Sequence, residues 1–272
     1  MRTIAHLSDL HFGRHDPKVV DGLLASLAAH KPDVVVITGD LTQRARSSEF
    51  IEARRFLERI AQPRLVIPGN HDMPLYNVFR RLQKPFRRYN RYIEPSGLPH
   101  CFYRDDEIAV LGLNTARRLK WKEGRVSLTQ MARIQAMLGS VSASIFKIVA
   151  THHPLAEADS ARAGVAARAR LALHAIAASK VHVLLSGHHH HALSGEGAID
   201  MALNHSVLVI SAGTAVSTRL RGDQANSYNL ISAKPPHLSV GIMEWRSGRG
   251  FKQAGLESYV LNENSWRSVR GA

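Results

Sequence analysis

Residues 33–40 read DVVVITGD, an unbroken apolar run that stops at a glycine and an aspartate. Its β-branched residues favour an extended strand, and the lack of polar alternation is typical of a strand buried on both faces. Six further runs share this pattern and end in small or polar residues: TIAHLSD (3–9), RLVIPGN (64–70), IAVLGLN (108–114), FKIVATHH (146–153), VHVLLSGH (181–188) and SVLVISAG (206–213). The repetition predicts a sheet core that is covered on both sides.

Helical periodicity fills the stretches between several of these runs. Apolar residues recur at helical spacing over residues 16–31, 47–62, 128–140 and 164–179. Strand and helix therefore alternate, which predicts an α/β architecture. The tail from about residue 226 is expected to form short antiparallel strands that complete the sheet or run along its edge. No repeat or linker suggests a domain boundary, so residues 1–272 are expected to form one domain.

The segment from residue 73 to about residue 100 departs from this rhythm and is expected to form an inserted helical cap. It mixes cations with aromatic residues: Phe79, Arg80, Arg81, Lys84, Phe86, Arg87, Arg88, Tyr89, Arg91 and Tyr92. Three interpretations stay open. The cap binds substrate phosphate, with Arg87 and Arg88 as the candidate contacts, or stacks on a base; it touches anionic lipid; or its aromatics pack inward while its arginines face water.

Composition limits the classes of function. The formal charge of +14 predicts attraction to anions, among them nucleic acid, phosphoesters and acidic membranes. No apolar stretch approaches the roughly 20 residues of a membrane span, and no signal region follows the start, so a cytoplasmic location is expected. Cys101 is the only cysteine, which excludes an internal disulfide and a thiolate metal site. A metal would have to be held by nitrogen and oxygen ligands.

Polar side chains that suit such a metal follow five of the apolar runs. They are Asp9 and His11, Asp40, Asn70 with His71 and Asp72, His152 with His153, and His188 with His190. In α/β sheets the functional crevice lies outside the carboxyl ends of the strands, so these loops are expected to converge on one rim. Imidazole, carboxylate and amide groups favour Mn, Fe or Zn over Mg or Ca.

These motifs, in this order, resemble the calcineurin-like metallophosphoesterase superfamily. The set runs D-x-H, G-D, G-N-H-D, H-x-P and G-H-x-H and spans residues 9–190. The resemblance implies a four-layer αββα sandwich of two mixed β-sheets flanked by helices, with two metal ions at the sheet rim. It also implies the ligand sets: Asp9, His11, Asp40 and His190 for one ion, and Asp40, Asn70, His152 and His188 for the other.

The same resemblance suggests catalytic roles. A metal-bound hydroxide would attack phosphorus, and His71 would donate a proton to the leaving group or stabilise the transition state. Asp72 would fix the tautomer of His71. Within the histidine runs, His152 is preferred to His153 as the ligand, and the neighbours of His188 and His190 are expected to point elsewhere.

The expected activity is hydrolysis of a phosphoester, most simply a small nucleotide-like phosphodiester such as a cyclic nucleotide. A metal-dependent nuclease is one alternative, which the positive charge favours. A lipid-linked phosphoester or pyrophosphate hydrolase is another, although the related family that cleaves a UDP-linked lipid A precursor carries Arg at the position of His71. A noncatalytic metal-binding scaffold is the alternative of a different class. Nothing in the sequence predicts the oligomeric state.

Overall fold

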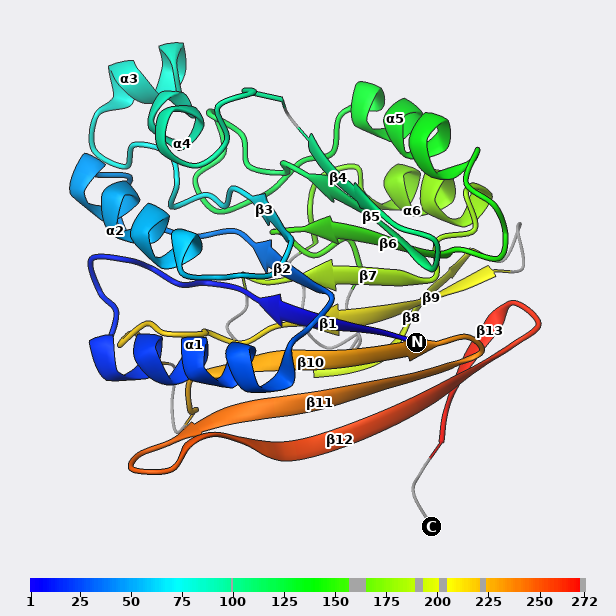
Figure 1. Ribbon diagram of the computed structural model, residues 1–272. Coiled ribbons are helices and arrows are strands. Elements are labelled where there is room, and N and C mark those ends of the chain that lie inside the picture. Colours follow the sequence, from blue (N-terminus) through cyan, green and yellow to red (C-terminus); the bar gives the residue numbers. More distant parts are fainter. Residues whose placement is uncertain (99, 157–164, 189–192, 201–204, 221–223, 270–272) are drawn as a thin grey trace.

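Two β-sheets pack face to face and carry helices on their outer faces (Figure 1). This computed structural model describes residues 1–98, 100–156, 165–188, 193–200, 205–220 and 224–269. Three separate apolar cores account for the layers. One core joins the first sheet to its helices, one joins the second sheet to its helices, and the third fills the space between the sheets. The four-layer αββα arrangement is therefore confirmed.

The first sheet has the strand order β13-β12-β11-β10-β1-β2-β3. Its parallel part consists of β1 (Arg2–Leu7), β2 (Val34–Thr38) and β3 (Arg64–Ile67). Its antiparallel part consists of β10 (Ser227–Lys234), β11 (His237–Arg246), β12 (Gly250–Asn262) and β13 (Ser265–Ser268). The tail from residue 226 thus completes the sheet, as expected.

The second sheet has the strand order β4-β5-β6-β7-β9-β8. Four strands run parallel: β5 (Ile108–Leu113), β6 (Phe146–Thr151), β7 (Val183–Ser186) and β9 (His205–Ser211). The antiparallel edges are β4 (His100–Arg104) and β8 (Leu193–Asp200). Every apolar run identified in the sequence forms a strand, whereas the two edge strands were not predicted.

The covering helices begin at local sequence signals. The helix α1 (Pro17–His30) starts with Asp16 accepting a hydrogen bond from the Lys18 amide, and α5 (Leu128–Leu138) starts with a capping box of Ser127 and Gln130. Two further helices complete the outer layers: α2 (Ser47–Glu58) and α6 (Ala169–Ala178). None of the described helices is long and apolar enough to cross a membrane.

The expected cap contains two short helices, α3 (Val78–Gln83) and α4 (Arg87–Tyr92). Lys84 to Phe86 separate them, and the proline at position 85 interrupts helical hydrogen bonding there. Tyr89 is buried and its hydroxyl donates to the Val66 carbonyl, which fixes α4 against the first sheet. The cap lies between β3, at the edge of the first sheet, and β4, at the edge of the second.

Candidate metal centre

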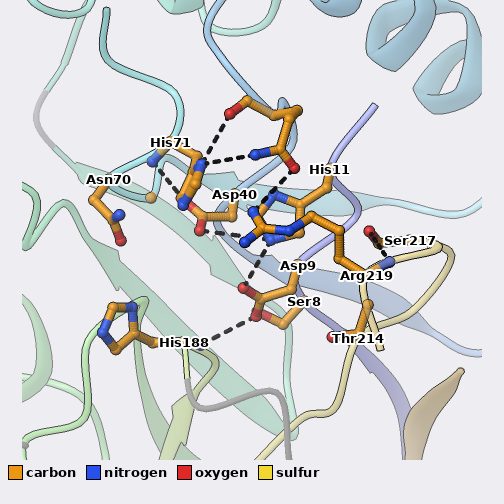
Figure 2. A network of polar contacts seen from close by, with 12 residues as sticks. Ser8, Asp9, His11, Asp40, Asn70, His71, His188, Thr214, Ser217 and Arg219 are labelled. Atoms are coloured by element: carbon orange, nitrogen blue, oxygen red, sulfur yellow. Dashed lines mark hydrogen bonds and ion pairs between the residues drawn. The ribbon is translucent and has the colours of Figure 1, made fainter. Parts of the chain in front are cut away.

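The polar residues that follow the parallel strands meet at one rim of the two sheets. Asp9 and His11 follow β1, Asp40 follows β2, and Asn70 and His71 follow β3. From the other sheet, His152 follows β6 and His188 follows β7. Figure 2 shows the side chains of Asp9, His11, Asp40, Asn70, His71 and His188 around a common space. The predicted convergence of the loops is therefore present in the structure.

Unusual backbone conformations place these side chains. Asp9, His11, Asp40 and His188 have φ angles of 53°, 47°, 52° and 72°. Left-handed conformations are uncommon for residues other than glycine and cluster at functional sites. Four of the predicted ligands thus adopt a local geometry that only the surrounding structure can hold.

The ring of His152 lies at the centre of one group of ligand atoms. Its Nδ1 donates to the Thr38 carbonyl at 2.7 Å, so the neutral ring presents a lone pair at Nε2. That Nε2 lies 3.1 Å from Asn70 Oδ1 and 3.3 Å from His188 Nδ1. Asp40 Oδ2 lies 3.4 Å from the same nitrogen. These mostly electron-rich atoms converge in a buried space, and such an arrangement favours a cation between them.

The pKa values of Asp40 and His152 also show that positive charge is stabilised between these side chains. Burial acts against charge on both Asp40 and His152, yet their attraction holds the pKa of Asp40 well below its usual range and raises the pKa of His152 to about 9. His71 and His11 also help to lower the pKa of Asp40. A proton or a metal cation is therefore stabilised between these side chains.

A second group of ligand atoms shares Asp40. His11 Nε2 lies 3.6 Å from Asp9 Oδ1 and 3.9 Å from Asp40 Oδ2. The Oδ2 atom of Asp40 thus faces both His11 and His152, while its Oδ1 accepts a hydrogen bond from the His71 amide at 2.8 Å. This geometry suits a carboxylate that bridges two ions. The predicted ligand His190 lies outside the described residues.

Asp72 supports the centre in a way that differs from the expectation. Its carboxylate accepts hydrogen bonds from the amides of Leu41, Thr42 and Gly69 and from the Thr42 hydroxyl. Burial and the neighbouring Asp40 charge raise its pKa to about 6, against these hydrogen bonds. Asp72 therefore joins the loop after β2 to the loop after β3, because all its described hydrogen bonds go to those loops.

The tautomer of His71 is fixed by a different group. His71 Nδ1 lies 2.8 Å from the Gln43 carbonyl oxygen, which can only accept, so Nδ1 carries a proton. The His71 ring meets the His11 ring edge to face, with centroids 4.9 Å apart. The expected role of Asp72 toward His71 is corrected accordingly: Gln43 orients the ring, since its carbonyl occupies the Nδ1 position.

His153 sits beside the centre but makes other contacts. It is buried, and its Nδ1 lies 2.8 Å from the Thr115 hydroxyl. Its ring centroid lies 4.8 Å from those of His152 and His188. In this arrangement His152, rather than His153, reaches the Asp40 carboxylate.

Arg219 reaches the site from a segment that the sequence analysis did not identify. It lies in the loop between β9 and β10, where its amide donates to Ser217 Oγ and its Nη1 donates to Gln43 Oε1 at 3.3 Å. Figure 2 shows its guanidinium beside His11. Arginine in an ordinary polar loop carries no local signal of function, because only the fold brings this loop to the rim.

The cap residues Arg87 and Arg88 lie apart from the two groups of ligand atoms. They line a hollow of about 420 Å³ together with Arg80, Lys84 and Arg91, and Asp72 contributes to the same lining. Arg88 Nη1 donates to the Ala45 carbonyl at 2.7 Å, so part of that side chain holds α4 in place. Arg87 remains exposed to solvent.

Comparison with known proteins shows that most of the chain matches one protein family. The family described as calcineurin-like phosphoesterase matches residues 2–192. The glycerophosphodiester phosphodiesterase GpdQ of Enterobacter lignolyticus is 35% identical over 80 residues, which is 25% of this chain and 29% of the relative. A probable glycerophosphodiester phosphodiesterase GpdQ of Arcobacter nitrofigilis is 30% identical over 86 residues, 32% of this chain and 29% of the relative. The matched parts thus span less than a third of these curated relatives.

Solved structures share the fold at low sequence identity. A purple acid phosphatase from yellow lupin superposes with a TM-score of 0.71 and 13% identity, covering 94% of this chain and 53% of the other. A dimetal phosphatase from Danio rerio gives a TM-score of 0.68 and 11% identity, covering 96% of this chain and 99% of the other. At these identities the likeness concerns the arrangement of the chain alone.

Gly69 allows the loops after β2 and β3 to pack closely, and we expect Gly69→Ala to displace Asp40. A Cβ atom at residue 69 would lie 2.1 Å from Asp40 Oδ1 and 2.5 Å from the Asp40 amide nitrogen. We expect the free energy of unfolding to fall by about 1–3 kcal/mol and metal binding to weaken. Denaturant unfolding and metal analysis measure these effects.

Gly255→Ala is the matched control for this prediction. The nearest atom to a Cβ there is 3.6 Å away, on Ile242, which is an ordinary contact. If both variants lose equal stability and Gly69→Ala retains its metal, the close packing at Gly69 does not position Asp40.

Proposed function

Because the chain belongs to the calcineurin-like phosphoesterase family, we propose that it is a two-metal phosphodiesterase that acts on a small, nucleotide-like phosphodiester. The observation that carries the proposal is the convergence of Asn70 Oδ1, Asp40 Oδ2 and His188 Nδ1 on His152 Nε2. Asp40 faces His11 as well, which supports a pair of ions that shares one carboxylate.

The proposed ligands divide between the two ions as the motifs imply. Asp9, His11, Asp40 and His190 would hold one ion, and Asp40, Asn70, His152 and His188 the other. The nitrogen and oxygen donors suit Mn, Fe or Zn. When bound, such a pair supplies Lewis-acid polarisation of a phosphoryl oxygen and lowers the pKa of a water toward about 7.

His71 is the proposed proton donor to the leaving group. With Nδ1 engaged by the Gln43 carbonyl, Nε2 is the nitrogen left to act on substrate. The doubly protonated ring donates a proton from Nε2, and the carbonyl then holds the product ring in a single tautomer. The Asp40 carboxylate, which accepts from the His71 amide, keeps this residue beside the ligand atoms.

Arg219 is the proposed contact for a nonbridging phosphoryl oxygen. Its guanidinium lies beside His11, Arg219 is exposed, and Gln43 Oε1 occupies only part of its donor capacity. A planar guanidinium offers several N–H donors to phosphate oxygens. Arg87 is a proposed outer contact for a second anionic group, since it borders the hollow behind Asp72.

A glycerophosphodiester is the second candidate substrate. The names of the two curated relatives favour it, and the match to them lies within a quarter to a third of this chain. A cyclic nucleotide and a glycerophosphodiester present the same diester group to the metal centre but differ in the groups that the cap side of the site would contact.

The test of function combines metal analysis with two chromogenic substrates. We expect two transition-metal ions per chain and faster hydrolysis of bis-p-nitrophenyl phosphate than of p-nitrophenyl phosphate. Asp40→Asn should weaken binding of both ions and lower activity by at least about 100-fold, because its carboxylate faces both groups of ligand atoms. A single ion per chain, or preference for the monoester, contradicts the proposal. Cyclic nucleotides and glycerophosphodiesters then separate the two candidate substrates.

For His71→Ala, we expect both ions to stay bound while kcat falls by roughly 10² to 10⁴ on a diester with a poor leaving group. The loss should shrink for a nitrophenolate, which departs without needing a proton. Loss of a metal ion would make His71 a ligand. An equal loss for both leaving groups would assign it to stabilising phosphate charge.

For Arg219→Ala, we expect KM for the diester to rise about 10- to 100-fold and inhibition by inorganic phosphate to weaken in parallel. Arg219→Lys should recover part of the loss because it keeps the charge without the planar fork. Arg246→Ala is the control, since Arg246 is exposed and pairs with Glu244 on β11. Unchanged KM and unchanged phosphate inhibition would show that Arg219 does not contact substrate.

A further inference from the structure

On α3 a cationic side chain is buried and the apolar side chains are exposed, which is the reverse of the usual arrangement. Arg81 is buried, with 1% of its surface exposed, whereas Val78, Phe79 and Leu82 are 51%, 69% and 39% exposed. The open interpretation in which aromatics pack inward while arginines face water fits Tyr89 on α4, but it does not fit Arg81 and Phe79 on α3. A surface helix normally buries its apolar face, so this exposed face needs a partner.

Arg81 fixes a second segment beside α3. Its guanidinium donates to the carbonyls of Pro74, Arg118 and Lys120 and lies 4.6 Å from the centre of the Trp121 ring. Arg118 in turn donates to the Leu82 carbonyl. The loop over residues 117–122 is therefore held against α3 by a buried network.

Both segments expose apolar side chains, and the hydrogen bonds of Arg81 and Arg118 hold the segments side by side; this set of side chains is here called the α3 patch. Leu119 is 72% exposed and Trp121 is 50% exposed. From the cap side, Tyr76 adds a ring that is 71% exposed. The patch consists of Tyr76, Val78, Phe79, Leu82, Leu119 and Trp121.

Positive charge surrounds the α3 patch. Residues 73–93 contain six Lys and Arg residues and no Asp or Glu, and residues 117–122 contain four more, again with no acid. Arg80, Lys84, Arg118 and Lys122 are exposed. The adjacent acid Glu123 forms an ion pair with Lys120 at 2.5 Å. Charge complementarity therefore favours a partner whose surface is uniformly anionic.

We propose that the α3 patch docks the chain onto the surface of an anionic lipid bilayer. Aromatic and aliphatic side chains enter the boundary between headgroups and acyl chains, and surrounding cations are attracted to anionic headgroups. Tryptophan and tyrosine are suited to this boundary because each has an apolar ring and a polar tip. The patch combines both components on one face.

One contact links the patch to the loop that orients His71. Arg44 lies over the Tyr76 ring, 5.3 Å from its centroid, and its neighbour Gln43 orients His71. α3 lies at the outer edge of the molecule in Figure 1, beyond α2 and α4. Binding requires no turnover, so it is tested independently of the proposed activity.

The test is cosedimentation of the full chain with vesicles of phosphatidylcholine, with and without phosphatidylglycerol. We expect binding to the anionic vesicles and little to the neutral ones. The double variant Val78→Ser, Trp121→Ser should weaken binding at least about tenfold, and Lys122→Glu should weaken it about fivefold or more, because neither Val78 nor Lys122 lines the hollow beside Arg87. Hydrolysis of bis-p-nitrophenyl phosphate in solution should stay unchanged in these variants.

The matched controls are Leu256→Ser and Lys252→Glu on β12. Leu256 is 60% exposed and Lys252 is also exposed, but neither belongs to the patch. Equal loss of binding in controls and patch variants overturns the proposal, as does absence of binding to anionic vesicles. Self-association that the Val78→Ser, Trp121→Ser variant abolishes, with vesicle binding unaffected, also overturns it and assigns the patch to a second copy of the chain.

Discussion

The position of the Asp40 carboxylate is the constraint on which the rest of the site depends. One oxygen faces His11 and His152, and the other accepts from the His71 amide. That position requires a left-handed backbone at Asp40 and a glycine at residue 69. Asp72 then joins the two loops through backbone amides. The strained loops, the glycine and the buried second carboxylate all serve to hold one negative charge at a defined place.

The ligand atoms come from both sheets, so the metal centre also bears on the packing of the layers. His152 follows a strand of the second sheet, yet its Nδ1 donates to Thr38 at the end of β2 in the first. Asp9 Oδ2 accepts from the His188 amide across the same boundary. A cation bound between these residues would contribute part of its binding free energy to the contact between the sheets.

The sequence predicted the strands and the loops that meet at the rim, because these depend on local apolar runs and on the rule that parallel strands end on one edge. The four layers were implied by the resemblance of the motifs to a known superfamily. It did not predict the edge strands β4 and β8. It also did not predict Arg219, whose loop reaches the site only through tertiary folding. The orientation of His71 by Gln43 depends on a backbone carbonyl, which has no residue-type signal. The reversed face of α3 depends on carbonyls from a distant loop that accept from Arg81.

Gln43 has a further consequence for how such a site can diversify. Its main-chain carbonyl orients His71, while its side chain accepts from Arg219. Any amino acid at position 43 supplies a carbonyl, but only some supply an acceptor for the guanidinium. A substitution at position 43 can therefore change the contact with Arg219, the proposed substrate contact, while the main-chain carbonyl still orients His71, the proposed proton donor. During evolution, the side-chain contact to Arg219 can vary while the main-chain contact that orients His71 is retained.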